Sequence, residues 1–476
     1  MPSSEPGLVA HRRQFVLASA AVLPEPGWLS LAITNELRLS YQPDLPVRRL
    51  DHAGRQVTLF GYGLTAATEP VGADLAESLA GRFGWIDWPY LYPDAGALFP
   101  IYYGNTPEGP FVTSSLALAG RMTDAATGQR QISWAGLNWT PPPGTPVSGF
   151  RKLMRDQRLH IPTATAEPID RALRPAASVE QARDNMAEDL AGISGTLQDR
   201  PGTIYLALTA GLDSRTLLAA LIATDTQFEC ITQTFDGVNP NDIEVAGRIA
   251  RHLGLKHHVI GPEIRDESLT QIWREHSAKT YSDADNIHLL PQNQYRFLKA
   301  DDVLVRGGCF ELGRRFYSSR LVGLDFSNAT GAALWSRFET EAPDPQTVAA
   351  LDEWLDWRRR HDNGLDLVDA FYIDQRAGGW LSAVEHSLDM MPGLSLPAAN
   401  CGRILSALIT PGEADREAGR LQRETIRQLA PGLQKFPINP TSFGDRATKL
   451  LRRTKDGLKR RLKQVLPVGL VQKLKR

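Results

Sequence analysis

The chain contains 476 residues, with 53 Lys and Arg against 54 Asp and Glu, so its formal net charge is −1. The length suggests at least two domains, and 42% hydrophobic with 22% charged residues is ordinary for a globular protein. The three cysteines, Cys230, Cys309 and Cys401, are widely spaced, which argues against a disulfide framework or a structural zinc site and fits a cytoplasmic protein.

Residues 8 to about 120 show short apolar runs separated by Gly, Pro and Asp, a pattern typical of β-strands and turns. Arg12-Arg13 and the apolar residues after them have some similarity to a twin-arginine export signal. The apolar run is short and lacks a cleavage box, so we favour a strand. The predicted strands are Gln14–Leu23, Trp28–Ile33, Gln56–Gly61, Phe83–Trp88, Ala97–Tyr103 and Phe111–Ser115.

Two segments rich in turn-forming residues follow this β-rich part. One is the proline-rich run Thr140–Pro146, and the other, His160–Pro175, is predicted to be a linker between domains. The pattern then changes to helical spacing, which predicts a helix from the N-cap Ser178 to about Leu197.

Beyond residue 200, predicted strands alternate with predicted helices. This alternation indicates βαβ units that form a parallel sheet, and such sheets bind ligands at the carboxyl ends of their strands. Residues from about 346 onward have a helical pattern. The strands are Thr203–Leu208, Phe228–Phe235, His257–Ile260 and Asp302–Arg306, and the helices among them include Ser214–Thr224 and Asp242–Leu253.

The run from Thr209 to Ser214, Thr-Ala-Gly-Leu-Asp-Ser, joins a predicted strand to a predicted helix. The backbone N–H groups of such a turn and of the helix N-terminus form a cradle for anions. The run resembles the PP-loop of ATP pyrophosphatases, whose usual form is Ser-Gly-Gly-x-Asp-Ser, with Ala210 in place of one Gly. An ordinary strand-to-helix turn is the alternative interpretation.

Two further segments resemble the synthetase domain of the asparagine synthetase family. In residues 303–311, Gly307 matches the first Gly of the family's Ser-Gly-Glu-Gly-Ala-Asp-Glu segment, and Cys309 replaces the second Gly. Glu311 lies where the family carries an Asp that helps to hold Mg²⁺ and pyrophosphate. In residues 232–258, the residues that match the family's second element are Asp242, Ala246, Ala250, Leu253, Gly254 and His257 or His258.

The resemblance implies that ATP and Mg²⁺ bind at these loops. Thr209, Gly211 and Ser214 would cradle the pyrophosphate. Asp213 and Glu311 would hold Mg²⁺ and take part in catalysis. The residues that would border the adenosine are Leu208, Thr234, Arg306 and Gly307.

The roles of Arg306 and Asp242 have alternatives. Arg306 is an unusual residue beside adenosine and could contact phosphate instead. Asp242 could support the Thr209–Ser214 loop through hydrogen bonds, or it could cap the helix that follows Pro240-Asn241, and we favour the cap.

The N-terminal half is similar to the family's glutaminase-type domain, which is an α+β sandwich of the Ntn type. That domain needs a cysteine as residue 2, but position 2 is Pro2 and no cysteine occurs before Cys230. We therefore expect residues 1–160 to form a degenerate glutaminase-like domain without glutaminase activity. The matching segments are Gly81–Gly84, Pro93–Gly96, Pro100–Tyr103 and Val112–Ser115.

The segments Asp369–Trp380 and Leu396–Leu408 look like the helical part of the same synthetase domain, which the resemblance extends over residues 161–445. This domain would be a parallel-sheet, adenine nucleotide α-hydrolase-like α/β domain. Gly419 stands where the family has a Lys that stabilises amide formation, four residues before an Arg matched by Arg423. Arg420 could substitute for that Lys as a catalytic residue, and Lys435 and Lys449 are the alternatives.

The predicted function is therefore ATP-dependent amide formation. A small-molecule or peptide carboxylate would be adenylated, with release of pyrophosphate, and ammonia or an amine would displace AMP. Two alternatives stay open: a catalytically degenerate nucleotide-binding partner in a biosynthetic complex, for example for surface polysaccharide, and a macrolactam-forming cyclase. The sequence does not discriminate among them.

A basic tail, residues 446–476, contains twelve Lys or Arg and one acid, Asp456, and Leu and Val recur in it at near-helical spacing. This pattern is typical of an amphipathic helix on an anionic membrane surface, which would place the protein at the inner face of the membrane. A helix packed on the acidic remainder of the chain is the favoured alternative. No nucleic acid is expected, because interleaved aromatic residues are missing.

Overall fold

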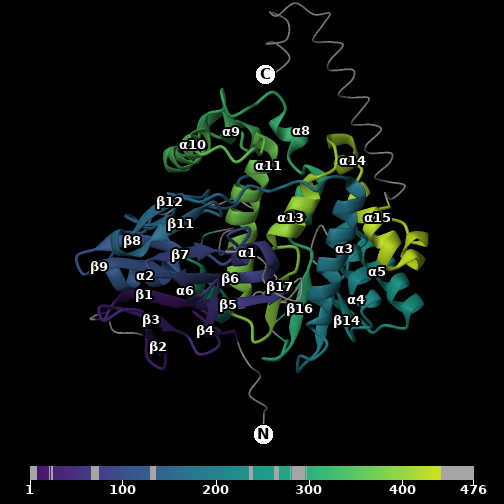
Figure 1. The fold of residues 1–476 in the computed structure, drawn as a ribbon, viewed down its shortest axis with the longest axis horizontal. Coiled ribbons are helices and arrows are strands. Elements are labelled where there is room, and N and C mark those ends of the chain that lie inside the picture. Colours follow the sequence, from purple (N-terminus) through teal and green to yellow (C-terminus); the bar gives the residue numbers. More distant parts are fainter. Residues whose placement is uncertain are drawn as a thin grey trace, which may run out of the picture.

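The computed structural model describes residues 8–20, 22, 25–65, 74–128, 136–234, 240–261, 267–278, 280, 295 and 297–440. These residues form an antiparallel β-sandwich followed by a parallel α/β unit (Figure 1). The basic tail at 446–476, with Lys449, and Pro2 lie outside the described residues. Within the described ranges, no helix is both long and apolar enough to cross a membrane.

Two six-stranded antiparallel sheets share one apolar core in the N-terminal sandwich. The Phe15 and Phe60 rings, one from each sheet, lie 4.7 Å apart between centroids in this core. The first sheet has the order β10 (Arg151–Lys152), β8 (Tyr102–Thr106), β9 (Gly109–Thr113), β1 (Phe15–Ser19), β3 (Leu37–Tyr41), β2 (Leu29–Ala32). The second has the order β12 (Thr165–Pro168), β11 (Gln157–His160), β7 (Tyr90–Pro93), β6 (Leu79–Asp87), β5 (Arg55–Thr65), β4 (Val47–His52).

The sandwich has more strands than the sequence pattern predicts. β3, β4 and β7 have no counterpart among the predicted strands, and the linker predicted at His160–Pro175 is wrong for its first half. There η1 (Ile161–Thr163) turns the chain, and β12 pairs antiparallel with β11. β12 is a short edge strand whose side chains are exposed or half-buried, which explains why its sequence resembles a linker.

Another predicted strand begins later in the chain than expected, because a buried aspartate stabilises the turn before it. The strand predicted at Ala97–Tyr103 begins only at Tyr102. Asp94 holds the preceding turn, because its carboxylate accepts hydrogen bonds from the backbone N–H groups of Leu98 and Phe99 at 2.8 and 2.7 Å.

The C-terminal unit contains the predicted parallel sheet. Its strands are β13 (Ile204–Ala207), β14 (Glu229–Gln233), β15 (His257–Ile260), β16 (Val303–Arg306) and β17 (Leu394–Pro397). They are all parallel, in the order β15-β14-β13-β16-β17. The first four confirm the predicted strands, whereas β17 lies where only helix is predicted. β17 is four residues long and buried throughout, so it shows no periodicity that a sequence pattern could reveal.

Helices pack around this sheet. α3 (Val179–Gly195), α4 (Leu212–Ala223), α13 (Gly402–Ile409) and α15 (Arg420–Leu429) contact one another beside it (Figure 1). The hydroxyl of Ser178 accepts a hydrogen bond from the Gln181 N–H at 3.1 Å, so the predicted N-cap of α3 is confirmed. α5 (Pro240–Leu253) lies between β14 and β15 in the chain.

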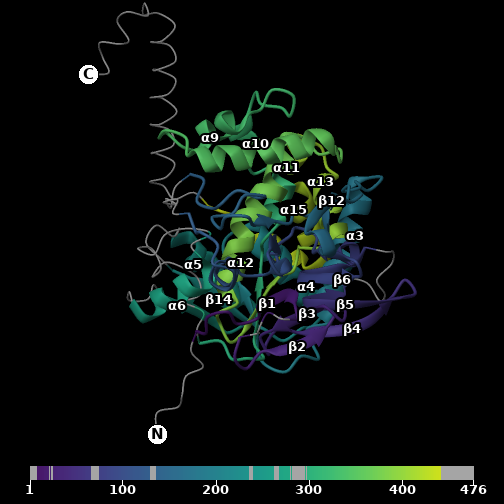
Figure 2. The ribbon, with the colours of Figure 1, turned by 90° about the vertical axis from the view of Figure 1, so that its left-hand side faces the viewer.

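The remaining helical elements are short or lie at the periphery. α8 (Ser318–Leu321), α9 (Gly331–Phe338) and α10 (Pro345–Arg360) lie at one end of the molecule (Figure 1), and Figure 2 shows α9 and α10 at this end from another side. The others are α1 (Leu75–Ser78), α2 (Leu116–Thr123), α6 (Glu267–Ser277), η3 (Phe310–Arg314), α14 (Glu413–Glu417) and η5 (Pro431–Lys435).

One continuous helical segment runs through the middle of the molecule (Figure 1). It consists of α11 (Leu367–Ala370), the π-helix η4 (Phe371–Leu381) and α12 (Ser382–Leu388). α12 packs against β17 and α6, and η4 approaches the sandwich. π-Helices are rare and occur frequently at functional sites.

A buried ion pair joins the sandwich to this central segment. Arg82 of β6 is fully buried, and its guanidinium donates to both carboxylate oxygens of Asp389 at 2.7 and 3.0 Å. Arg13 donates to the backbone carbonyls of Asp389 and Met391 at 3.1 and 2.9 Å. Because an unpaired buried charge is strongly destabilising, these pairings fix the two units against each other.

Three histidines, of which His276 and His386 are buried and His11 is half-buried, lie at the same junction. The backbone N–H of His11 donates to Nδ1 of His276 at 2.9 Å, and Nε2 of His276 bonds the carbonyl of His386 at 2.7 Å. The rings of His276 and His386 stack at 4.2 Å. Burial lowers the pKa of His276 to about 4 and that of His11 to about 3, and it also lowers the pKa of His386 well below its usual value. All three rings are therefore neutral at pH 7.

We predict that this junction loses stability in acid. The unfolded chain binds protons at His276 below pH 6.5, but the folded chain does not until about pH 4, so stability is complete above 6.5 and falls between these values. For His276 alone the loss is roughly 3 kcal/mol. His276→Gln keeps one hydrogen-bond acceptor and one donor but has no group that titrates in this pH range. Its urea midpoint should therefore fall less than that of the wild type from pH 7 to pH 4.5. Parallel curves would contradict the prediction.

Candidate active site

The strand order creates a switch point in the parallel sheet. β13 lies between β14 and β16, so the chain leaves β13 toward one edge of the sheet and later adds β16 and β17 on the other side. In open α/β sheets, ligands bind in the crevice outside the carboxyl ends of strands at such a point. A cleft of about 390 Å³ lies there, and Thr209, Ser214, Gly307 and Glu311 are among its lining residues.

The loop after β13 is held by its own side chains. The Thr209 N–H donates to the Ser214 hydroxyl at 3.1 Å, and the Gly211 N–H donates to the Thr209 hydroxyl at 3.1 Å. Gly211 is the N-cap of α4 and offers no side-chain cap. The first N–H groups of α4, at Leu212, Asp213 and Ser214, have no intrahelical acceptor, so they can bind an anion.

Asp242 supports this loop. Its Oδ1 atom accepts a hydrogen bond from the Ala210 N–H at 2.9 Å. α5 begins at Pro240, so Asp242 lies inside the first turn and is not the residue that precedes the helix. The favoured prediction, a helix cap, is therefore wrong, and the alternative role in loop support is the one observed.

The segment 436–440 fastens the loop from outside. The Asn439 N–H donates to the Ala210 carbonyl at 3.0 Å, and Asn241 Nδ2 donates to the Pro440 carbonyl at 2.7 Å. Arg215 of α4, which is fully buried, donates to the carbonyls of Phe436 and Pro437 at 2.8 Å each. The loop geometry therefore depends on residues more than two hundred positions away in the chain.

Asp213 and Glu311 both line the cleft. Oδ2 of Asp213 accepts a hydrogen bond from Arg314 at 2.6 Å, whereas its buried Oδ1 has no hydrogen-bond partner among the described residues. Burial raises the pKa of Asp213 to about 6, the Arg314 guanidinium opposes this rise, and the Glu311 carboxylate adds to it. Oδ1 therefore has no hydrogen-bond donor among the described residues, and the negative charge of Glu311 opposes ionisation of Asp213.

The donor set fits Mg²⁺ in part. An unpaired carboxylate oxygen of Asp213 and the carboxylate of Glu311 are hard oxygen ligands of the kind Mg²⁺ prefers. Over the part of the chain that the structure describes, no three His, Cys, Asp or Glu side chains form a metal-binding group. Such a pair suits Mg²⁺ that takes its other ligands from water and substrate phosphate.

The chain after β16 approaches α4 closely. A Cβ atom on Gly307 would lie 3.1 Å from Cβ of Asp213 and 3.4 Å from the Ser214 nitrogen, which explains the glycine. Cys309 adopts a left-handed backbone with φ of 74°, the region that favours glycine. Its side chain is buried, and burial raises the pKa of the thiol well above its ordinary value, so no thiolate forms here.

Most of the residues that the sequence predicts to bind the nucleotide line the cleft, whereas Gly211 and Thr234 do not. Gly211 adjoins the cleft as the N-cap of α4, and Thr234 lies at the end of β14, where its N–H donates to the Ile260 carbonyl at 2.8 Å. Arg306 lines the cleft, but its guanidinium is paired with buried Glu385 at 2.5 Å. The predicted residues that line the cleft are Leu208, Thr209, Asp213, Ser214, Arg306, Gly307 and Glu311.

Arg420 does not line this cleft. It begins α15, where its guanidinium pairs with Asp415 at 2.9 Å and with Glu424 at 2.8 Å in an exposed position. Gly419 does not line the cleft either, and a Cβ atom there would lie 2.5 Å from Cδ1 of buried Leu212. These positions argue against the predicted catalytic role of Arg420. The alternative Lys435 is exposed and bonds His252 at 2.6 Å.

Part of the cleft wall consists of residues that the sequence motifs do not identify. Tyr372, Arg376 and Trp380 of η4 line it together with Tyr295. The signal that could have identified the first three is their spacing of four residues, which places them on one side of a helix.

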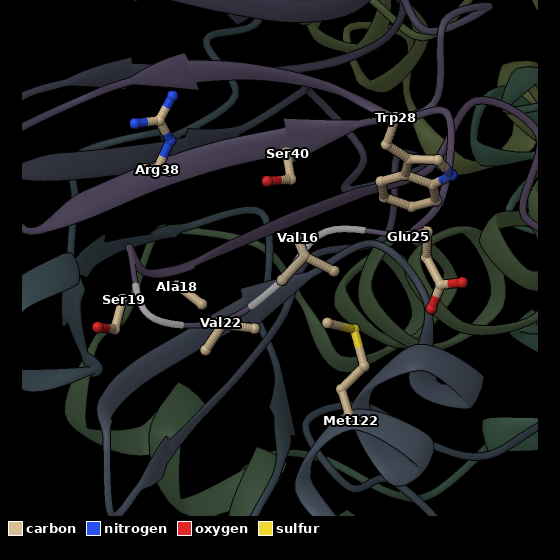
Figure 3. Close-up of a pocket in the computed structure, with 9 residues that line it drawn as sticks. All are labelled: Val16, Ala18, Ser19, Val22, Glu25, Trp28, Arg38, Ser40 and Met122. Carbon is tan, nitrogen blue, oxygen red and sulfur yellow. The ribbon is translucent and has the colours of Figure 1, made fainter.

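A second hollow, in the sandwich, is too small for a ligand. It lies between β1, β3 and α2, where Val16, Ser40, Trp28 and Met122 are among its lining residues (Figure 3). Its volume is about 10 Å³, which is room for about one water molecule.

Comparisons with known proteins leave the family open. No protein-family model matches the chain, and no curated protein matches its sequence. A solved structure of NMN synthetase from Francisella tularensis is 11% identical with a TM-score of 0.22, covering 56% of this chain and 100% of that one. The NH3-dependent NAD synthetase from Campylobacter jejuni is 14% identical with a TM-score of 0.19, covering 38% and 75%. Glutamine phosphoribosylpyrophosphate amidotransferase from B. subtilis is 10% identical with a TM-score of 0.20, covering 75% and 83%.

At these TM-scores the likenesses support no conclusion about function. The resemblance to asparagine synthetases stays a prediction from the sequence, and the case for a function depends on the geometry of the cleft.

We predict that Asp242→Ala destabilises the loop. Ala210 is fully buried, so its N–H would lose its acceptor, which lowers the free energy of unfolding by about 1–2 kcal/mol. Asp242→Asn keeps an oxygen that can accept this bond and should lose less. Urea unfolding of both variants measures the difference, and equal stability of Asp242→Ala and the wild type would contradict the loop-support role.

Proposed function

We propose that this chain is an ATP-dependent ligase that adenylates a carboxylate and transfers the acyl group to ammonia or an amine. One observation carries the proposal: the N-terminus of α4, the unpaired Oδ1 of Asp213 and the Glu311 carboxylate line a single cleft at the switch point of a parallel sheet. A triphosphate needs N–H donors and a divalent cation. The N-terminus of α4 can provide the N–H donors, and the two carboxylates can hold the cation. Residues 161–445 would form the ATP pyrophosphatase domain.

In the first step, a carboxylate oxygen of the substrate attacks the α-phosphorus of ATP. The new P–O bond forms as the bond between the α-phosphorus and its bridging oxygen breaks, and pyrophosphate leaves with that electron pair. Charge that develops on pyrophosphate would lie against the Thr209 hydroxyl and the N–H groups of Asp213 and Ser214. These donors are fixed in advance by the bonds between Thr209 and Ser214, so they need little reorganisation during the reaction.

In the second step, an uncharged nitrogen attacks the acyl carbon. The bond from that carbon to the AMP oxygen breaks, AMP leaves with the electron pair, and the nitrogen loses a proton. Mg²⁺ held by Asp213 and Glu311 would neutralise phosphate charge when bound. Arg314 orients Asp213 through their 2.6 Å bond and adds positive charge beside the loop.

The nitrogen would come from ammonia or an amine and not from glutamine. Glutamine hydrolysis of the expected type needs an accessible thiolate. Cys230, Cys309 and Cys401 are all buried, and burial raises the pKa of Cys230 and Cys401 to about 12. The sandwich of residues 1–160, extended by β12, would then be a glutaminase-like fold with a structural role.

A second candidate function is nucleotide binding without turnover, in a partner of a biosynthetic complex. The observation that favours it is the position of Arg420, because no cation at the start of α15 reaches the cleft. If the amide-forming step needs such a cation, only binding would survive.

We predict that Asp213→Asn abolishes pyrophosphate release while the fold persists. The substitution keeps the size of the side chain but removes the charge that would hold Mg²⁺, so release should fall by about two orders of magnitude or more. Incubation with ATP, Mg²⁺ and a panel of carboxylic acids, with pyrophosphate as the readout, measures this. Glu244→Gln, which changes an exposed acid on α5, is the matched control and should keep wild-type release.

Two results would count against the ligase. Equal pyrophosphate release from Asp213→Asn and the wild type would exclude this cleft as the reaction site. Tight binding of ATP without release across the whole acid panel would favour the nucleotide-binding partner.

We also predict that ammonium salts support amide formation and that glutamine does not. The reason is that the described cysteines are buried and stay protonated. Glutamate release from glutamine, measured in the presence of ATP and the best acid of the panel, should equal the rate without protein. A protein-dependent release of glutamate would refute the prediction.

A further inference from the structure

The π-helix η4 has one face fixed to the sandwich. Nζ of buried Lys152 donates to the carbonyl of Gly378 and to the hydroxyl of Ser382, and Gln375 Nε2 donates to the carbonyl of Pro142 at 2.7 Å. A Cβ atom on Gly379 would lie 2.5 Å from the Trp139 ring, so this face of η4 touches its neighbours without a gap. The orientation of η4 is therefore set by the sandwich.

The opposite face of η4 carries Tyr372, Arg376 and Trp380 into the cleft. The guanidinium of Arg376 lies 3.5 Å from the centroid of the Trp380 ring and 5.8 Å from that of Phe316. Such stacking holds a planar guanidinium in one orientation without neutralising its charge.

Arg376 has no anionic partner in the part of the chain that the structure describes. No carboxylate lies within ion-pair distance of it there, and its buried Nε atom has no hydrogen-bond acceptor. The other arginine of the cleft, Arg306, is neutralised by Glu385. A cation that lines a cleft and lacks a counter-charge is completed by a ligand that brings one.

The charges of the cleft are separated between its two walls. Asp213 belongs to the first turn of α4, which follows β13, and Glu311 belongs to η3, which follows β16, whereas Arg376 comes from η4. Both kinds of charge act on Tyr372. Burial raises the pKa of its hydroxyl well above its usual value, the Glu311 carboxylate adds to the rise, and the Arg376 guanidinium opposes it. A protonated hydroxyl that lines the same cleft can donate a hydrogen bond to an anion bound there.

The anion that pairs with Arg376 is not the carboxylate that reacts. Adenylation converts that carboxylate into a neutral ester carbonyl, which would leave Arg376 unpaired halfway through the reaction. Arg376 is half-buried, so the loss of this pair would weaken the binding of the intermediate. A second oxyanion on the substrate keeps its charge through both steps and avoids this loss.

We propose that Arg376, held by Trp380 and assisted by the Tyr372 hydroxyl, binds a non-reacting carboxylate or phosphate group of the acid substrate. This inference rests on the proposed function and narrows its substrate class to acids that carry a second anionic group. Arg376 is thus a residue that determines specificity and positions the substrate.

Calorimetric titration with succinate and with butyrate tests the subsite, because the two acids have the same chain length and differ by one carboxylate. Inorganic phosphate, as a competitor of succinate, tests whether the second group can be a phosphate. The protein is first saturated with Mg²⁺ and α,β-methylene-ATP, which occupies the loop at Thr209–Ser214. The variants are Arg376→Met, Arg376→Lys and Arg320→Met, the last a matched control in which an exposed guanidinium over the Phe338 ring is removed.

The wild type and Arg320→Met should bind succinate at least about tenfold more tightly than butyrate, the equivalent of one charge-assisted hydrogen bond. Arg376→Met should lose this preference and keep its affinity for the nucleotide analogue within about twofold, a difference too small to be a lost hydrogen bond. Arg376→Lys should restore part of the preference, because the charge is kept and the planar fork is lost.

The proposal is overturned if the preference is absent from the wild type or persists in Arg376→Met. A loss of analogue affinity in Arg376→Met, with the acid preference unchanged, would assign Arg376 to the nucleotide phosphates. The proposed function fails separately. If the preference for succinate depends on Arg376 but no acid supports pyrophosphate release, the subsite stands and the ligase activity is refuted. If pyrophosphate release is normal but the preference does not depend on Arg376, the ligase activity stands and the subsite is refuted.

Discussion

The buried pair of Arg82 and Asp389 is the interaction on which the arrangement of the two units depends. Arg82 belongs to the sandwich, whereas Asp389 immediately follows the central helical segment. Neither charge can be left without the other inside the protein, so the sandwich and the central segment are stable only in this relative position. The neutral histidines beside the pair add hydrogen bonds but no compensating charge, which makes the same junction sensitive to acid.

The central segment transmits this constraint to the cleft. One face of η4 is bonded to the sandwich through Lys152 and Gln375, and the other presents Arg376 to the parallel sheet. The sandwich therefore has a physical role, because it orients the cleft wall that carries Arg376. The 436–440 segment has a comparable role on the other side, where it fastens the Ala210 carbonyl.

Much of the fold follows from local pattern. The alternation of apolar strands and helices predicts β13 to β16, and the Ser178 cap predicts the start of α3, because periodicity and capping act within a few residues. β12 and β17 are missed for opposite reasons. β12 is a short edge strand without fully buried side chains that forms through pairing with β11, and β17 is too short and too uniformly buried to show a period. Both depend on partners distant in sequence.

The sequence by itself determined the loop from Thr209 to Ser214 and the presence of acids at 213 and 311, because a strand, a turn and a helix N-terminus in succession already form an anion cradle. Only the tertiary structure decided which charges in that cleft are free. Arg306 is neutralised by Glu385, Arg420 is turned to solvent, Asp242 holds the loop, and Arg376 is left without a partner among the described residues. The physical reason is that the charge available to a ligand depends on which side chains pair across the fold, and such pairs join positions that no local pattern connects.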